Sequence, residues 1–315
     1  MEHKIDILLS TYNGELFLTQ QIDSILSQTY KDWHLTIRDD GSIDGTLGLV
    51  KDYCKKYPDE ITFSKDNLGR LGLERSFSQL LEKSSSNYVM FCDQDDVWLP
   101  EKVEKSIKKL LLIEKEFPGV PALIFTDLEV VDSSLNHISS SFWKYQCANP
   151  KRTKLNHLLV QNMASGNTMI MNRALGVLIG RIPAEAIGHD WWTALTAAAF
   201  GKIGYLPEAT IKYRQHSGNT SGALGYSLNT LLKFWPPYSP KQVAYNLRKF
   251  RQAVKFLELF SDKLSLEQRT VLHRFIKIYS ANPIEKICMS LTNGFLPSGV
   301  LRTLYYFVSF IFTKV

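Results

Sequence analysis

The first 127 residues alternate between short apolar runs and amphipathic segments, and this alternation restricts the fold more than any other feature of the sequence. A short continuous apolar run is typical of a buried strand, whereas apolar side chains recurring every three or four residues indicate a helix. The apolar runs occupy residues 5–10, 33–40, 88–93 and 122–127, and the helical patterns occupy residues 15–28, 46–57 and 100–117. This alternation predicts a Rossmann-like, mostly parallel sheet with helices on both faces.

Polar residues collect where three of these strands end, at residues 10–13, 39–42 and 93–96. Open sheets of this kind bind their ligands outside the carboxyl ends of the strands. We therefore expect the three stretches to meet in one crevice.

The stretch FCDQDDVWLP (91–100) places three aspartates directly behind an apolar strand. Carboxylates this close repel one another unless a positive charge lies among them. A divalent cation such as Mg²⁺ or Mn²⁺ that also binds a diphosphate would meet this need, because both metals prefer oxygen ligands. The alternative is a solvated acidic turn in which Asp96 caps the following helix.

Three other stretches carry polar groups at the predicted crevice. STYNG (10–14) offers hydroxyls, an aromatic ring and an amide for a base and a ribose, RDDGSIDGT (38–46) offers Asp40 for a nucleobase N–H, and KDNLGRLGLERSF (65–77) offers arginines for an anion. A helix cap, a tight turn and a surface loop are the corresponding structural alternatives. The phosphate-binding loop G-x-x-x-x-G-K-[ST] and the dinucleotide fingerprint G-x-G-x-x-G are both absent from the sequence, which disfavours an ATPase or a dehydrogenase.

The composition is that of an ordinary folded protein, with 44% hydrophobic and 22% charged residues. The four cysteines lie far apart without a C-x-x-C spacing, so we expect neither a zinc site nor a disulfide framework, and a reducing compartment. The N-terminal residues predict a first strand rather than a secretory signal.

Positive charge is concentrated near the end of the chain. Residues 228–315 contain 13 Lys and Arg against 4 Asp and Glu, whereas the preceding residues carry a net charge of −3. Such a basic segment indicates an anionic partner, either nucleic acid or an anionic lipid surface. Nucleic acid is disfavoured, because the aromatic residues crowd into the last 15 positions, away from most of the charge.

Residues 241–260 predict an amphipathic helix with Lys and Arg opposite its apolar face, which comprises Val243, Leu247, Phe250, Val254 and Leu257. The final stretch, LRTLYYFVSFIFTKV, is shorter than the about 20 apolar residues that span a bilayer. It predicts a segment that lies in the membrane interface, with Tyr305 and Tyr306 at the level of the headgroups. The alternative is a helical hairpin that packs on the protein or forms a homodimer.

Taken in order, LLSTYNG, SQTYKDWHLTIRDDGSIDGT and FCDQDDVW resemble the family 2 glycosyltransferases, which are inverting nucleotide-sugar enzymes of GT-A fold. The resemblance covers roughly residues 4–222. Two later stretches, GHDWW (188–192) and YRQHSGNTSG (213–222), resemble the branch that contains bacterial rhamnosyltransferases of surface polysaccharides. The resemblance implies a GT-A catalytic domain over residues 1–225, followed by a C-terminal helical extension over residues 226–315.

The resemblance also implies roles for individual residues. Asp190 matches the general base, with the alternative that it caps a Trp-rich core helix. Asp95 and His216 match metal ligands, although a lone histidine is more often structural. The residues implied for nucleotide binding are Ser10, Thr11, Tyr12, Asn13, Asp40, Asn67, Arg70 and Asp93. The residues implied for the acceptor or the transferred sugar are Ser165, Gly166, Trp191 and Trp192. How Asp93, Asp95 and Asp96 divide their roles is left open.

The implied reaction is metal-dependent transfer of a sugar, with Mg²⁺ or Mn²⁺ as the cofactor. The leading donor is dTDP-L-rhamnose, and the acceptor is a growing cell-surface polysaccharide or a lipid-linked glycan. UDP-galactose, UDP-glucose or a UDP-N-acetylhexosamine are alternative donors, and a catalytically silent nucleotide- or glycan-binding scaffold is a third hypothesis. We expect a cytoplasmic protein held peripherally at the inner face of the cell membrane.

Overall fold

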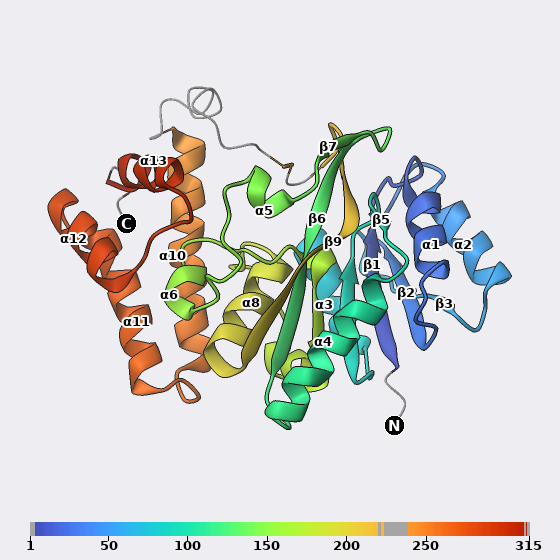
Figure 1. The fold of residues 1–315 in the computed structure, drawn as a ribbon, viewed down its shortest axis with the longest axis horizontal. Helices are drawn as coiled ribbons and strands as arrows, with labels where there is room; N and C mark the ends of the chain where they lie inside the picture. Colours follow the sequence, from blue (N-terminus) through green and yellow to red (C-terminus); the bar gives the residue numbers. More distant parts are fainter. Residues whose placement is uncertain (1–3, 220–221, 224–238, 312, 314–315) are drawn as a thin grey trace.

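The computed structural model describes residues 4–219, 222–223, 239–311 and 313. Within these residues it contains one nine-stranded sheet with helices on both faces, followed by a group of C-terminal helices (Figure 1). The strands are β1 (Ile5–Thr11), β2 (Trp33–Asp39), β3 (Ile61–Phe63), β4 (Tyr88–Cys92), β5 (Val97–Trp98), β6 (Ala122–Asp132), β7 (His137–Ser139), β8 (Ile170–Asn172) and β9 (Lys202–Gln215). The helices before β9 are α1 (Leu18–Leu26), α2 (Thr46–Lys56), α3 (Leu73–Lys83), α4 (Lys102–Glu116), α5 (Phe142–Tyr145), α6 (Leu155–Leu158), the 3₁₀ turn η1 (Gly166–Thr168), α7 (Arg173–Ile179) and α8 (His189–Phe200).

The strand order is β3-β2-β1-β4-β8-β6-β9-β5, with β7 paired to β6. Strands β3, β2, β1 and β4 run parallel, as the sequence predicts, and so do β6 and β9. The short strand β8 is antiparallel to both β4 and β6 and joins the two parallel parts. The polar stretches after β1, β2 and β4 consequently lie at the same edge of the sheet.

Two hydrophobic clusters cover the two faces of the sheet. Helices α1, α2 and α4 bury one face, and α3, α7 and α8 bury the other. The predicted apolar face of α1 comprises Leu18, Ile22, Ile25 and Leu26; the first three are fully buried and Leu26 is partly buried against the same cluster. These layers place the loops at the carboxyl ends of β1, β2 and β4 on a rigid support.

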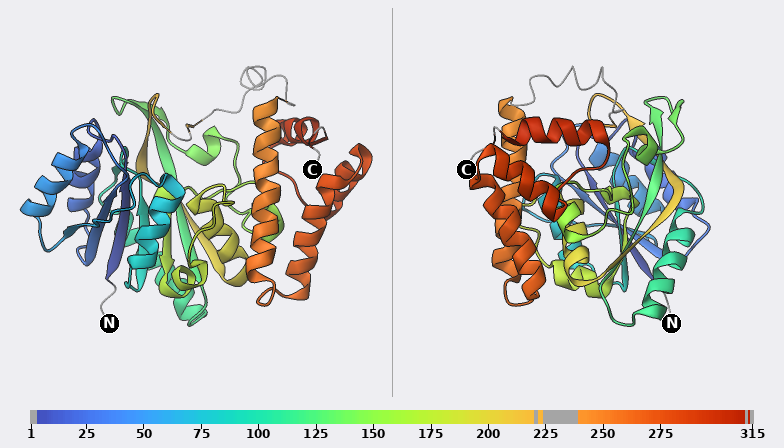
Figure 2. Two further views of the ribbon diagram at one scale, coloured as in Figure 1. Left: turned by 180° about the vertical axis from the view of Figure 1, so that it is seen from behind. Right: turned by 60° about the vertical axis from the view of Figure 1, so that its left-hand side comes forward.

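The C-terminal helices pack beyond α8 and α6 (Figures 1 and 2). They are α10 (Pro240–Phe260), α11 (Leu266–Lys277), the 3₁₀ turn η2 (Ile278–Ser280), α12 (Pro283–Asn293) and α13 (Val300–Ile311). Their buried apolar side chains belong to the same hydrophobic cluster as those of α8. The sheet with its covering helices and the C-terminal helices therefore share one continuous core.

The predicted apolar face of α10 is only half-buried, and other positions of the helix are buried fully. The fully buried side chains of α10 are Asn246, Lys249, Gln252, Ala253, Phe256 and Phe260. The helix lies between α8 on one side and the last helices on the other, so two of its faces meet protein. The expectation that its Lys and Arg all face solvent is therefore wrong for Lys249.

The last helix, α13, packs on the protein through one of its faces. The ring of Tyr306 stacks on that of Phe310 at 5.0 Å, and Phe310 contacts Tyr279 at 4.9 Å. Tyr306 is buried against the protein, so its predicted position among the headgroups is wrong, and the predicted membrane contact of the segment stays a prediction. Another face stays exposed, with Leu304 at 58% and Val308 at 38%. No helix in the described part of the chain has the length and hydropathy needed to cross a bilayer.

Candidate active site

The aspartates of residues 93–96 lie in the connection from β4 to β5, at the carboxyl edge of the sheet. The carboxylate of Asp95 is 2.9 Å from Nε2 of His216, which follows β9. The ring of His216 also contacts Phe17 at 4.7 Å, which fixes its orientation toward the aspartates. The structure thus brings together the two side chains that were predicted as metal ligands, although they are separated by 121 positions.

Arg214 holds the backbone of this loop in place. Its Nε donates to the carbonyl of Asp95 at 2.8 Å, and its other nitrogens donate to Ser133 and Gln20. The guanidinium also stacks on Phe17, 4.4 Å from the ring centre. Because these contacts use its donors inside the protein, Arg214 shapes the site rather than offering its charge to a ligand.

Asp96 points away from the crevice and is fully buried. It accepts hydrogen bonds from the backbone N–H of Arg214 at 3.0 Å and from the side-chain amide of Asn167. Helix α4 begins after Glu101 without a side-chain cap, so the alternative that Asp96 caps this helix is wrong. Asp96 instead ties the aspartate loop to β9 and η1, while Asp93 and Asp95 are partly exposed at the crevice.

The loop after β1 presents Tyr12 to the crevice. The guanidinium of Arg70 lies 4.0 Å from the centre of the Tyr12 ring, an arrangement that cation–π attraction stabilises. Gln94, between the two outward aspartates, accepts from the N–H of Tyr12 at 2.8 Å and donates to its carbonyl at 3.1 Å. This clamp was missed by the sequence analysis, because a glutamine between aspartates gives no signal of its own.

Several residues predicted to bind the nucleotide are engaged inside the protein. The hydroxyl of Ser10 donates to Ser76 at 2.6 Å, and that of Thr11 donates to Gln94 at 2.7 Å. Asn13 adopts a left-handed conformation with φ of 48° and accepts from the N–H of Ile43. Ser10 and Thr11 are buried and shape the loop from behind, whereas Asn13 and Asn67 are exposed.

Asp40 is buried and accepts three protein hydrogen bonds. Its carboxylate receives the guanidinium of Arg38 at 2.6 Å and the N–H groups of Leu71 and Gly72 at 2.7 and 2.8 Å. Arg38, also fully buried, extends the network to Asp66. Asp40 therefore anchors the loop that carries Arg70, and its contact with a nucleobase stays a prediction.

Asp190 is the second residue of α8, and the cap position belongs to Gly188, so the alternative that Asp190 caps the helix is wrong. Its Oδ1 accepts from the N–H of Trp191 at 2.6 Å. Burial raises the pKa of Asp190 to about 6, although hydrogen bonds from nearby N–H groups oppose the change. Burial, together with the charges of Asp95 and Asp190, raises the pKa of Asp93 to about 8. Asp190 thus lies close enough to Asp93 for its charge to act on that carboxyl group.

Gly166 lies beside Asp190, and Ser165 directly precedes it. A side chain at Gly166 would collide with Nε2 of His189 and would contact Asp190, so only glycine fits this position. The ring of His189 is buried and stacks on Phe77 at 4.0 Å. Burial lowers the pKa of His189 to about 3, so the imidazole is neutral at physiological pH.

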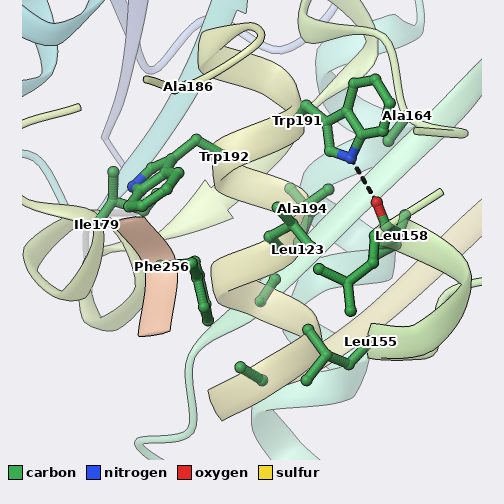
Figure 3. Close-up of a cluster of buried hydrophobic side chains, with 14 of the residues drawn as sticks. Leu123, Leu155, Leu158, Ala164, Ile179, Ala186, Trp191, Trp192, Ala194 and Phe256 are labelled. Carbon is green, nitrogen blue, oxygen red and sulfur yellow. Dashed lines mark hydrogen bonds between the residues drawn. The ribbon is translucent and has the colours of Figure 1, made fainter. Parts of the chain in front are cut away.

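The two tryptophans after Asp190 belong to the hydrophobic core. They leave α8 on opposite sides (Figure 3), and Trp192 is fully buried against Phe256 at 5.2 Å. Trp191 is 5% exposed, and its Nε1 donates to the carbonyl of Leu158 at 2.5 Å. The prediction that these rings form a wall for a sugar is therefore wrong, because neither ring presents an open face.

Comparison with known proteins identifies the family. Residues 6–177 match the model of the family described as glycosyl transferase family 2. The chain belongs to this family. The match runs from β1 into α7 and includes the loop that carries Tyr12, the aspartates of residues 93–96 and Gly166.

Two relatives illustrate the range of the family. The chain is 36% identical over 131 residues to EpsE of Bacillus subtilis, a provisionally named glycosyltransferase, which covers 40% of this chain and 46% of the relative. It is 25% identical over 224 residues to the dTDP-rhamnosyl transferase RfbG of Shigella flexneri, which covers 68% of this chain and 74% of the relative. The first match spans about half the length of the relative.

Solved structures share the fold at low identity. TarS of S. aureus in complex with UDP-GlcNAc superposes with a TM-score of 0.55 at 17% identity, covering 92% of this chain and 73% of that one. The mannosyltransferase PcManGT of Pyrobaculum calidifontis, with GDP-Man and Mn²⁺, gives a TM-score of 0.55 at 16% identity, with the same two coverages. Both are glycosyltransferases of GT-A type, which confirms the predicted fold.

Proposed function

We propose that this family 2 glycosyltransferase is an inverting, metal-dependent enzyme that transfers a sugar from a nucleoside diphosphate. The observation that carries the proposal is that Asp95, which pairs with His216, and Asp190 both lie close enough to Asp93 to raise its pKa. Through a cation, Asp95 and His216 can hold the departing diphosphate, and Asp190 can accept a proton. A silent binding scaffold would not need a carboxylate whose pKa is raised toward neutrality.

The donor set at the crevice fits a divalent cation. The carboxylate oxygen of Asp95 suits Mn²⁺ or Mg²⁺, and the imidazole nitrogen of His216 is a softer ligand, so the pair fits Mn²⁺ better than Mg²⁺. Over the described ranges, no three His, Cys, Asp or Glu side chains come close enough together to hold a metal by themselves. Asp95 and His216 would thus hold it from one side, with diphosphate and water as the other ligands. When bound, the cation would offset the negative charge that develops on the leaving diphosphate.

Asp190 is the proposed general base. With a pKa of about 6, its carboxylate is mostly ionised at neutral pH and still basic enough to take a proton. It accepts the proton of the acceptor hydroxyl while the hydroxyl oxygen bonds to the anomeric carbon of the donor. The bond from that carbon to the diphosphate breaks on the opposite side, so the configuration inverts.

The preferred donor in this proposal is dTDP-L-rhamnose. The support is the similarity to RfbG, which extends over most of this chain. A UDP-sugar is the second candidate, because the chain is also 25% identical over 174 residues to WfgD of Escherichia coli, a UDP-Glc-dependent glucosyltransferase. The Tyr12–Arg70 pair would stack on the nucleobase or bind the diphosphate of either donor.

The proposed acceptor is a growing surface polysaccharide or a lipid-linked glycan at the cytoplasmic face of the membrane. Val300, Leu304 and Val308 form one exposed stripe along α13, at intervals of four residues. Such a stripe can lie against a lipid surface, and the excess of Lys and Arg in residues 228–315 would favour an anionic leaflet. A second copy of the chain is the other candidate for covering this stripe.

Isothermal titration of the purified protein with dTDP and with UDP tests the proposal, each with and without Mn²⁺ or Mg²⁺. We expect metal-dependent binding, with dTDP tighter than UDP. A preference for UDP would keep the transferase and change the sugar. Binding of neither nucleotide in the presence of metal would refute the donor site.

A further inference from the structure

Two side chains of helix α10 hydrogen-bond to the backbone of Ile187, in the loop that leads to Asp190. Oε1 of Gln252 accepts from the N–H of Ile187 at 2.9 Å, and Nη2 of Arg248 donates to the carbonyl of Ile187 at 2.9 Å. Positions 248 and 252 lie one turn apart, so both side chains leave the same face of α10. The two polar groups of the Ile187 backbone are thus fixed by one helix, three residues before the base.

The same helix also contacts the residues that follow the base. The ring of Tyr245 lies 6.4 Å from that of Trp191, and Phe256 packs edge-on against Trp192 at 5.2 Å, as Figure 3 shows for the second pair. Asp190 therefore lies between two attachment points on α10. Moving this helix would move the chain on both sides of the carboxylate.

The contacts of Gln252 and Arg248 differ in their surroundings. Gln252 is 1% exposed, so water cannot readily replace it as the partner of the Ile187 N–H. Arg248 is about half exposed and also lies 3.8 Å from the carboxylate of Glu74 in α3. The negative charge of Glu74 is among the causes that raise the pKa of Asp190. Arg248 thus connects α10 to the loop before the base and to α3.

We propose that Gln252 and Arg248 are positioning residues for Asp190, which makes the C-terminal helices part of the catalytic apparatus. The inference rests on the proposed role of Asp190 as the base. A misplacement of about 1 Å at a reacting group can reduce turnover about 100-fold. A buried amide that fixes the backbone three residues away is a direct way to prevent such a misplacement.

The test compares Gln252→Ala with Gln252→Glu and with a matched control, Gln268→Ala. Gln268 also joins the C-terminal helices to α8, but it donates to the carbonyl of Ala199 at the far end of that helix. The assay is release of dTDP or UDP from the nucleotide-sugar that the protein binds, with water as the acceptor. Water adds to the anomeric carbon, the bond to the diphosphate breaks, and the proton of water goes to Asp190.

We expect kcat to fall about 10- to 100-fold in Gln252→Ala, while the Kd of the nucleotide stays unchanged. Gln252→Glu should recover most of kcat, because its carboxylate can accept from the same N–H. Gln268→Ala should retain full kcat. Hydrogen exchange of the Ile187 amide should be faster in Gln252→Ala, which reports the lost contact independently of turnover.

Normal kcat in Gln252→Ala with a faster Ile187 amide would overturn the inference. An equal loss in Gln268→Ala, or no recovery in Gln252→Glu, would also overturn it by showing a merely structural role. If Gln252→Ala does not fold, Arg248→Ala is the second variant, because its side chain is half exposed. Full turnover in Asp190→Asn would instead refute the base itself, and so the proposed function.

Discussion

Replacing Asp190 by Asn should make the protein more stable and far less active. The substitution keeps the size of the side chain and an oxygen that can accept from the N–H of Trp191, and it removes only the charge and the basicity. A general base contributes about 10²- to 10⁴-fold to the rate, so kcat should fall by that factor. Binding of the nucleotide should change little.

The gain in stability follows from the cost of burying the charge. The pKa of Asp190 rises from the usual 3.8 to about 6, a difference worth about 3 kcal/mol for a carboxylate shielded from water. The side chain is only partly covered, so solvent screening reduces the expected gain to about 1–2 kcal/mol. A pKa raised on folding means that folding favours the neutral acid. The variant should therefore be more stable at pH 8, and the difference should shrink as the pH falls through 6 toward 4.

Urea unfolding in the presence of a chelator measures the stability of both proteins at pH 8, 6 and 4.5, and nucleotide release measures kcat. Asp262→Asn, at an exposed position in the turn after α10, is the matched control and should change neither quantity. Equal stability of Asp190→Asn and the parent at every pH would refute the reasoning about charge burial. Near-normal kcat would refute the assignment of the base.

Three further perturbations test separate parts of the structure. Asp95→Ala should abolish the metal dependence of nucleotide binding in titration calorimetry, and unchanged dependence would mean that the cation binds elsewhere. Gly166→Ala should lower the free energy of unfolding in urea by about 1–3 kcal/mol, because the new methyl group meets buried His189; Gly48→Ala, with no atom within 4 Å, is its control and should not destabilise. Leu304→Glu should release the protein from anionic vesicles in a sedimentation assay without altering its fold, since this side chain is 58% exposed. Unchanged sedimentation, with a shift from dimer to monomer in gel filtration, would assign the exposed stripe of α13 to self-association.

The spacing of apolar residues correctly predicted those strands and helices whose own residues carry the hydrophobic pattern. The strands at residues 5–11 and 88–92 and the helix α4 lie where their apolar residues indicate. The stretch ASGNTMIMNR (164–173) fits one strand by its sequence, but only residues 170–172 form a strand, β8, whose pairing with β4 and β6 depends on contacts distant in sequence. The hydrogen bonds of Asp40 could not be predicted from the sequence for the same reason, because its partners Leu71 and Gly72 lie 31 and 32 positions away and only the fold brings them close.

The error at the tryptophans has a different cause. Family resemblance placed them beside the base, and their position directly after Asp190 suggested that they line the same crevice. Helix α8 is apolar on nearly all sides, however, and such a helix is typically buried all round. The run WWTALTAAAF carried that signal. Asp190, in the first turn of α8, lies near Asp93, whereas Trp192 is fully buried against Phe256.

The aspartates at the carboxyl edge of the sheet differ in the direction of their pKa shifts, because the charges around them differ. Asp66 pairs with Arg38 at 2.8 Å, and this guanidinium lowers the pKa of its carboxyl group. Such a pair contributes to the scaffold, because both charges are compensated when the protein folds. Asp93 and Asp190 have the opposite shift, caused by burial and by neighbouring carboxylates. Both groups cost stability when they are charged. Under the proposed function, a bound cation would favour the charged form of Asp93, and Asp190 would accept the proton of the acceptor hydroxyl.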